Sequence, residues 1–283
     1  MMHMEMMSGI PTVEDYNAVL NSELFLKMEI FSNNFLERNI SCLANYSRKW
    51  VADPLHQWSR QWEYPFVFNK ILEYTSGYPS SNIKILDAGS GMSFFPYFIS
   101  SNIDNAKITC CDSDSSLKDI FSNVVNHSKS QVDFIIDDIG KIPYKENTFD
   151  IIYCISVLEH TENFEQIIRE FKRLLKYNGI LIVTFDISIR GDADIPPRAA
   201  EELLQTLNKY LVGEQGMQSQ TLVEGLLSTN VLTTEYIRVF NRNLLPWKFP
   251  FLSALKPFLR FRIPTSTFIN LTCYCGVFRN EGV

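Results

Sequence analysis

A short apolar run that closes on an acidic residue and opens into a glycine turn constrains the fold of this chain most. Residues 83–86 form the run, Asp87 ends it, and the turn Gly89-Ser90-Gly91 follows. Glycine lets the backbone turn sharply from a strand into a helix and approach a nucleotide closely. A second acidic residue, Asp112, ends the next apolar run at residues 106–111, about where a ribose-binding carboxylate is expected. The pair predicts a nucleoside pocket.

The residues around the turn indicate which kind of nucleoside this is. Dinucleotide-binding turns carry a third small residue three positions after the second glycine, and here that position is Phe94. Asp87 also puts a carboxylate where a pyrophosphate would sit. The pattern favours a cationic, phosphate-free nucleoside such as S-adenosylmethionine (SAM). At this point the chain resembles the class I SAM-dependent methyltransferases, whose first motif is an acidic residue followed by Gly-x-Gly-x-Gly; Ser93 replaces the last glycine.

The resemblance continues over roughly residues 81 to 186, where six short motifs follow in the family's order and look like its UbiE-like, small-molecule branch. They are Asp137-Asp138-Ile139, Ile142-Pro143-Tyr144, Asn147-Thr148-Phe149-Asp150, Ile151-Ile152-Tyr153-Cys154, Val157-Leu158-Glu159-His160 and Lys176-Tyr177-Asn178-Gly179. The resemblance implies that Asp112 binds the ribose and that Asp138 and Ile139 flank the adenine. It implies a SAM site, with S-adenosylhomocysteine as the product, formed by Asp87, Gly89, Ser90, Gly91, Asp112, Ser113, Asp138, Ile139 and Ser156.

Short apolar runs separated by helix-length segments predict a parallel sheet covered on both faces. The runs are residues 83–86, 107–111, 132–136, 149–155 and 180–185, with a closing strand at 268–278. The clearest helix follows His160, with Asn163 as its N-cap and Asn178-Gly179 as its stop. We therefore expect an α/β, doubly wound, Rossmann-like fold: a seven-stranded, mostly parallel sheet with an N-terminal helical cap and a C-terminal insert.

Length and composition fit one enzyme-sized domain with additions. The chain has 283 residues, of which 46% are hydrophobic, whereas the methyltransferase unit needs about 200. We expect a helical cap or lid over residues 1–80 and a SAM-binding domain over 81–283, with an insert at about 187–265. The six cysteines show no CxxC pair or zinc spacing, so reduced core residues and no metal are expected. No apolar run spans a membrane and no export signal is evident, which predicts a cytoplasmic protein.

Two additions have open interpretations. The aromatic segment at residues 58–68 either packs the N-terminal helices onto the sheet or forms a lid over the cofactor and one wall of the acceptor pocket, where Trp62 would contact the acceptor. Its Trp-Glu-Tyr-Pro string resembles a segment of stand-alone bacterial methyltransferases, which implies that Tyr64 or Arg60 touches SAM.

The second addition is basic. Residues 236–280 carry seven Lys or Arg and no Asp or Glu, and residues 244–263 add aromatics and three prolines. This stretch is an anionic-acceptor wall, a surface for weak peripheral membrane association, or an insert with solvated charges. A nucleic-acid partner is disfavoured, because the overall pI near 5.3 repels a polyanion outside this stretch.

Methyl transfer is an in-line displacement, so the protein must mainly hold the acceptor roughly 3 Å from the methyl group and exclude water. Only a protonated acceptor needs a base, and His160 is the candidate, although it could instead cap the helix that follows. Glu159, Asp186 and Arg190 are further acceptor-binding candidates. If the acceptor is a carboxylate, an Arg would orient it.

The function we expect is SAM-dependent methyl transfer to a small-molecule or natural-product acceptor such as a sugar, a peptide or a carboxylate-bearing compound, with oxygen as the favoured atom. The alternative is a non-catalytic scaffold with this fold that binds a partner through its aromatic or basic additions. A nicotinamide oxidoreductase is disfavoured by Phe94 and Asp87.

Overall fold

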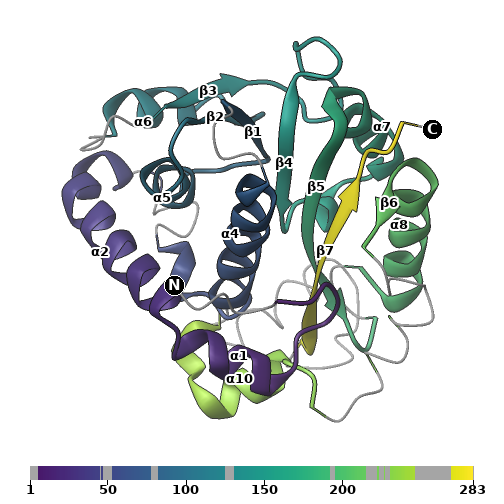
Figure 1. Cartoon of the computed structure of the whole chain (residues 1–283). Helices are drawn as coiled ribbons and strands as arrows, with labels where there is room; N and C mark the ends of the chain where they lie inside the picture. The colour runs from purple at the N-terminus through teal and green to yellow at the C-terminus, as the bar shows by residue number, and fades with distance from the viewer. Residues whose placement is uncertain are drawn as a thin grey trace, which may run out of the picture.

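A seven-stranded sheet runs through the middle of the molecule, in the order β3-β2-β1-β4-β5-β7-β6 (Figure 1). The computed structural model describes residues 6–44, 46, 53–77, 82–124, 131–191, 195–214, 222, 226, 230–245 and 269–282. The first five strands are parallel, and β7 lies antiparallel between β5 and β6. The predicted mostly parallel, seven-stranded sheet is confirmed.

The strands coincide with the apolar runs of the sequence. They are β1 (Ile83–Ala88), β2 (Ala106–Asp112), β3 (Val132–Ile136), β4 (Phe149–Ile155), β5 (Leu175–Ser188), β6 (Val212–Gly213) and β7 (Leu271–Arg279). Helices and helical turns fill the intervals: α1 (Val13–Leu20), α2 (Glu23–Leu43), η1 (Pro54–His56), α4 (Arg60–Ser76), α5 (Phe95–Asn102), α6 (Leu117–Asn123), η2 (Leu158–His160), α7 (Phe164–Leu174), α8 (Pro197–Tyr210), α10 (Thr234–Phe240) and η3 (Arg242–Leu244).

Each face of the sheet has its own apolar core. Along β4, Ile151 and Tyr153 pack with α2, α4 and α5, whereas Ile152 and Cys154 pack with α7 and α8. This alternation follows from the two-residue period of a strand. Helices therefore cover both faces, as a buried parallel sheet requires.

Most of the aromatic segment at residues 58–68 forms the first half of α4. Pro65 lies inside this helix, and residues 61–71 are buried without interruption. A proline removes only one backbone donor, and burial of the surrounding aromatic side chains outweighs that cost of about 3 kcal/mol. Residues 61–71 of α4 are buried on every side because the helix lies between the sheet and α2 (Figure 1).

The end of α7 also differs from the prediction. The helix begins after Asn163, which accepts a hydrogen bond from the Gln166 backbone as predicted, but it ends at Leu174 and passes directly into β5. The stop comes from a distant residue: the side chain of Asn280 donates to the backbone carbonyl of Leu175 at 2.9 Å. Asn178, at φ 60°, lies within β5 and pairs with the Asn280 backbone.

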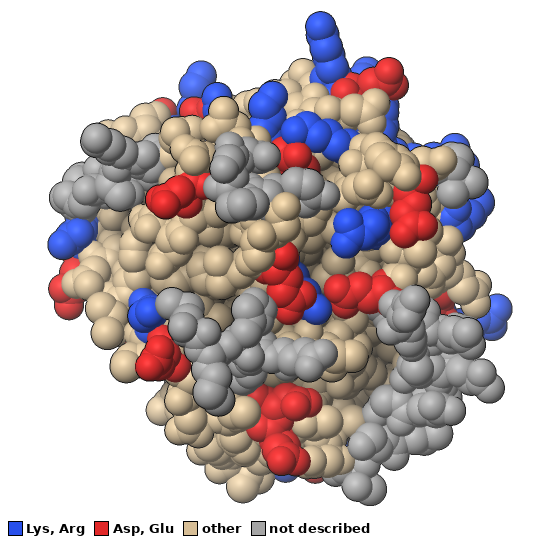
Figure 2. Space-filling view, viewed as in Figure 1, with Lys and Arg blue, Asp and Glu red and all other residues tan. Residues whose placement is uncertain are grey.

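The two ends of the chain meet at the sheet. Gly9 exchanges backbone hydrogen bonds with Cys275 of β7, at 2.7 and 3.0 Å. Of the basic stretch at 244–263, only Leu244 and Leu245 lie within the described residues, so its interpretations stay predictions. No helix of the described residues is both long and apolar enough to cross a membrane. On the face shown in Figure 2, acidic and basic side chains are scattered between broad uncharged areas.

Candidate functional site

A cavity of about 1090 Å³ opens beside the carboxyl ends of β1, β2 and β4, where the order of the strands reverses. Open α/β sheets bind their ligands at such a switch point. The volume lies at the upper end of the usual range for small-molecule sites, about 300–1,000 Å³. Twelve predicted site residues line it: Arg60, Tyr64, Asp87, Gly89, Ser90, Gly91, Asp112, Ser113, Asp138, Ile139, Ser156 and His160.

The two glycine positions of the turn after β1 have no room for a side chain. Gly89 has φ +75°, and a Cβ on it would lie 2.6 Å from a methyl carbon of Val157. Gly91 has φ +50°, and its Cβ would lie 3.0 Å from the hydroxyl of Tyr46. Only glycine adopts this left-handed backbone without strain. At Gly89 and Gly91 the turn thus presents bare backbone to the cavity.

Asp112 ties the turn to the end of β2. Its two carboxylate oxygens accept hydrogen bonds from the backbone N–H groups of Gly91 and Asp114, both at 2.9 Å. A carboxylate can accept about four hydrogen bonds, so Asp112 retains acceptor capacity toward the cavity. This is the geometry that a ribose with two hydroxyl donors needs.

Asp87 lies deeper and is 5% exposed. Burial raises the pKa of its carboxyl to about 8; the nearby carboxylate of Asp112 adds to this shift, and the hydroxyl of Tyr153 opposes it. A buried acid of this kind stabilises a cation placed next to it, because the ion pair offsets the cost of desolvation. The turn, Asp112 and Asp87 together fit a cationic nucleoside such as SAM.

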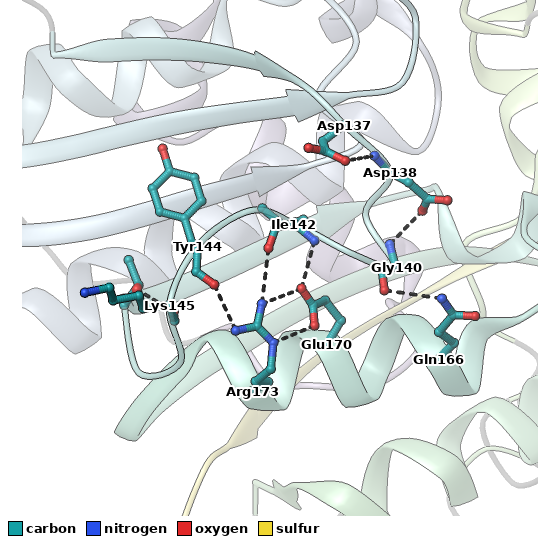
Figure 3. A network of polar contacts seen from close by, with 10 residues as sticks. Asp137, Asp138, Gly140, Ile142, Tyr144, Lys145, Gln166, Glu170 and Arg173 are labelled. Atoms are coloured by element: carbon teal, nitrogen blue, oxygen red, sulfur yellow. Dashed lines mark hydrogen bonds and ion pairs between the residues drawn. The ribbon is translucent and has the colours of Figure 1, made fainter.

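The loop after β3 forms another wall. Asp137, Asp138, Ile139 and Gly140 all line the cavity. The Asp138 carboxylate accepts a hydrogen bond of 2.7 Å from the Gly140 backbone, so it stabilises its own turn (Figure 3). The adenine-flanking position that the resemblance implies for Asp138 and Ile139 is therefore on this wall.

Helix α4 contributes the opposite wall through a buried polar cluster. The guanidinium of Arg60 donates to the Ser156 hydroxyl at 2.5 Å and forms an ion pair with Glu63, whose side chain is fully buried. The Ser156 hydroxyl in turn donates to Glu63 at 2.8 Å. Burial is the largest single effect and lowers the pKa of Arg60, but the surrounding groups, with the charge of Glu63 first among them, together outweigh burial and the net pKa is raised. Arg60 therefore lines this wall as a cation, and the carboxylate of Glu63 balances its charge.

Two tyrosines complete the site. Tyr64 stacks on Phe95 with ring centroids 4.5 Å apart, and burial raises its pKa. Tyr46, just after α2, accepts a hydrogen bond of 3.0 Å from the Met92 backbone and faces the glycine turn. The sequence analysis missed Tyr46, because no motif surrounds it and only the fold brings it 46 residues along the chain to Met92.

The four predicted acceptor contacts do not line the cavity. Glu159 is buried behind it and accepts a 3.2 Å hydrogen bond from the Asp186 backbone; burial raises the pKa of Glu159 to about 8. Trp62 is 3% exposed within the core of α4. Arg190 is exposed beyond the end of β5. His160, in contrast, reaches the cavity from η2.

Comparison with known proteins identifies a methyltransferase domain in the central part of the chain. Residues 86–183 match the family model described as a methyltransferase domain. An uncharacterized protein from Methanocaldococcus jannaschii is 42% identical over 65 residues, which cover 23% of this chain and 28% of that protein. The sterol 4-C-methyltransferase strm-1 of Caenorhabditis elegans is 31% identical over 87 residues, 31% of this chain and 25% of that protein. The matches thus span only about a quarter of these relatives' length.

Solved structures share the fold over much more of the chain. The [4+2]-cyclase SpnF has a TM-score of 0.51 at 18% identity, covering 81% of this chain and 84% of SpnF. A putative sarcosine dimethylglycine methyltransferase from Galdieria sulphuraria has a TM-score of 0.52 at 16% identity, covering 78% and 85%. At such identities the likeness extends to the fold alone.

Proposed function

We propose that this chain, which carries a class I SAM-dependent methyltransferase domain, transfers a methyl group from SAM to a small-molecule or natural-product acceptor. One observation carries the proposal: the glycine turn, Asp87, Asp112 and the Asp138 loop line the same cavity as His160 and the α4 wall. The cavity therefore combines a fit to a cationic nucleoside with space for an acceptor.

We propose that the cofactor lies along the strand ends. Asp112 would accept from the ribose hydroxyls, Asp138 and Ile139 would flank the adenine, and the turn with Asp87 would face the methionine end. The bound cofactor supplies an electrophilic methyl group. The surplus of acidic residues supports this orientation, because a positively charged ligand compensates them. Ser113, Ser156, Tyr64 and Arg60 would complete the contacts.

For the acceptor, we propose a hydroxyl oxygen. Such a group must lose a proton, and His160 is the cavity residue suited to take it. A carboxylate acceptor has less support, because Glu63 already neutralises Arg60 and because Arg190 is exposed away from the cavity. Trp62, Glu159 and Asp186 would then act behind the wall rather than on the acceptor.

We further propose a division into an N-terminal unit over residues 1–80 and a SAM-binding domain over 81–283, working on a small molecule in the cytoplasm without nucleic acid. The net charge of −6 supports the last point, since it opposes binding to a polyanion. Residues 1–80 would supply both core packing and one cavity wall, because α4 does both.

The alternative is a non-methylating role, and one observation favours it: the fold neighbour SpnF is described as a cyclase. Two measurements separate the functions. Calorimetry with S-adenosylhomocysteine tests the cofactor site, and transfer of labelled methyl from SAM to panels of hydroxyl, amine and carboxylate acceptors tests turnover. Binding with transfer supports the methyltransferase, binding with no transfer to any panel favours the alternative, and absence of binding overturns the methyltransferase proposal.

A further inference from the structure

We infer that Glu170 and Arg173 of α7 are positioning residues for the cofactor: together they fix the loop at residues 137–145 whose first part would flank the adenine. The inference rests on the proposed function. Neither side chain lines the cavity, so both would act on the cofactor only through the loop backbone.

The loop between β3 and β4 takes several of its hydrogen bonds from α7 instead of a neighbouring strand. Glu170 accepts from the Ile142 N–H at 2.8 Å. Arg173 donates to the carbonyls of Tyr144 at 2.8 Å and Ile142 at 3.1 Å. Figure 3 shows both side chains pointing from the helix into the concave side of the loop. Unpaired backbone groups here would be costly, since Ile142 is 2% exposed.

The two side chains also hold each other. Arg173 donates to the two carboxylate oxygens of Glu170 at 2.6 and 2.7 Å, which is the paired geometry of a guanidinium fork on a carboxylate. Burial raises the pKa of Glu170, but Arg173 and the Ile142 N–H outweigh it and the net pKa is lowered. Both partners are therefore charged at neutral pH, and their bonds to the loop are charge-assisted.

Side chains along one face of α7 make these hydrogen bonds to the loop. Gln166 lies four residues before Glu170 and donates to the Gly140 carbonyl at 3.4 Å. Spacings of three and four residues put Gln166, Glu170 and Arg173 on the same helix face. A side chain at position 140 would be crowded, because a Cβ there would lie 3.2 Å from both Asp138 and Gln166. The cavity wall at residues 137–140 is thus continuous with a backbone that α7 fixes at residues 142 and 144.

An arginine is required for this arrangement. Its five donors in a planar fork reach two carbonyls and one carboxylate at once, whereas a lysine ammonium is a compact point charge. Arg173→Lys should keep the ion pair with Glu170 and lose part of the hydrogen bonding to the loop carbonyls. Arg173→Gln should lose both.

Arg169 provides a matched control on the same helix. It lies four residues earlier, donates to Tyr210 and Glu165, and makes no hydrogen bond or ion pair with the loop among the described residues. Arg169→Gln removes a similar charge from α7 without touching the cofactor wall. The full-length protein and the variants R173Q, R173K, E170Q and R169Q are compared at a temperature where circular dichroism shows each to be folded.

We expect R173Q to raise the dissociation constant of S-adenosylhomocysteine by about tenfold or more, and R169Q to keep it within about twofold of the wild-type value. The dissociation constants of R173K and E170Q should lie between those of wild type and R173Q. Hydrogen exchange of the unliganded protein should show faster exchange at Ile142 and its neighbours in R173Q but not in R169Q. A purely structural role would lower the melting temperature and leave the affinity of the folded protein unchanged.

The outcomes separate the two proposals. If wild type fails to bind S-adenosylhomocysteine, the proposed function fails and this inference with it. If wild type binds and R173Q and E170Q bind equally well, the positioning role alone is overturned. Should R173Q not fold, R173K decides, because equal affinity and equal loop exchange in R173K and wild type would contradict the requirement for the fork.

Discussion

The carboxylate of Asp112 accepts a 2.9 Å hydrogen bond from the backbone N–H of Gly91, so the residue that ends β2 holds the turn that follows β1. Two neighbouring strands are joined in this way at the point where the cavity opens. The same carboxylate has the acceptor capacity for a ribose. In the proposed cofactor site, this one side chain would couple cofactor binding to the shape of the turn.

Asp112→Ala should weaken SAM binding by about 1 to 3 kcal/mol, because both the turn and the ribose hydroxyls would lose an acceptor. Calorimetry with SAM and S-adenosylhomocysteine measures the change. Asp133→Ala is the control, since Asp133 lies exposed on β3 and pairs with Lys107 at 3.3 Å. Unchanged affinity in Asp112→Ala would place the cofactor elsewhere.

Gly89→Ala should abolish cofactor binding and destabilise the fold. The new methyl group would lie 2.6 Å from Val157, and alanine is strained at φ +75°. Gly77→Ala is the matched control, with ordinary φ −75° and 3.5 Å to the nearest atom. Adding Val157→Ala to Gly89→Ala should relieve only the collision, so thermal unfolding should show partial recovery. Wild-type affinity in Gly89→Ala would show that the close approach is not required.

Asp87→Asn should flatten the pH dependence of stability. Burial raises the pKa of Asp87 to about 8 in the folded protein, against about 3.9 in an unfolded chain. Between these values the folded state holds a proton that the unfolded state has lost. Wild-type stability should therefore fall as pH rises from about 4 to 8, by up to about 1.4 kcal/mol per pH unit from this group, and then level off.

Denaturant unfolding of wild type and Asp87→Asn across this range measures the difference between the two slopes. The difference should vanish above about pH 8, where the Asp87 carboxyl of the folded protein is also ionised. Parallel curves over the whole range would show that Asp87 is ionised in the fold at neutral pH. SAM should release a proton from Asp87 on binding below that pH, and this release should be absent in Asp87→Asn.

His160→Ala should lower the methyl-transfer rate about a hundredfold for a hydroxyl acceptor, the usual effect of a lost general base. Steady-state rates at saturating SAM measure it, and cofactor affinity should be kept. His56→Ala is the control, because His56 pairs with Asp53 and Glu29 and does not line the cavity. A small effect with a carboxylate acceptor and a large one with a hydroxyl would identify the base; a small effect with both would remove His160 from the chemistry.

The sequence by itself determined what depends on neighbours along the chain. The strand runs, the N-cap at Asn163 and the turn at Gly89 to Gly91 all follow from local periodicity, hydrogen-bonding groups and backbone freedom. Asp112 could be predicted as well, because a ribose-binding carboxylate is expected about 20 residues after the glycine turn, at the end of the next strand. For this reason the sequence predicts the fold class and the cavity residues at the strand ends.

Only the tertiary structure decided what depends on contacts between distant segments. Asn280 ends α7, Tyr46 covers the glycine turn, and Glu63 neutralises Arg60 against Ser156. Burial made the aromatic segment helical despite its proline. Glu159 is buried outside the cavity lining, although His160 next to it lines the cavity. These contacts cannot be predicted from sequence spacing, because the order of strands in the sheet and the packing of α4 bring the partners together.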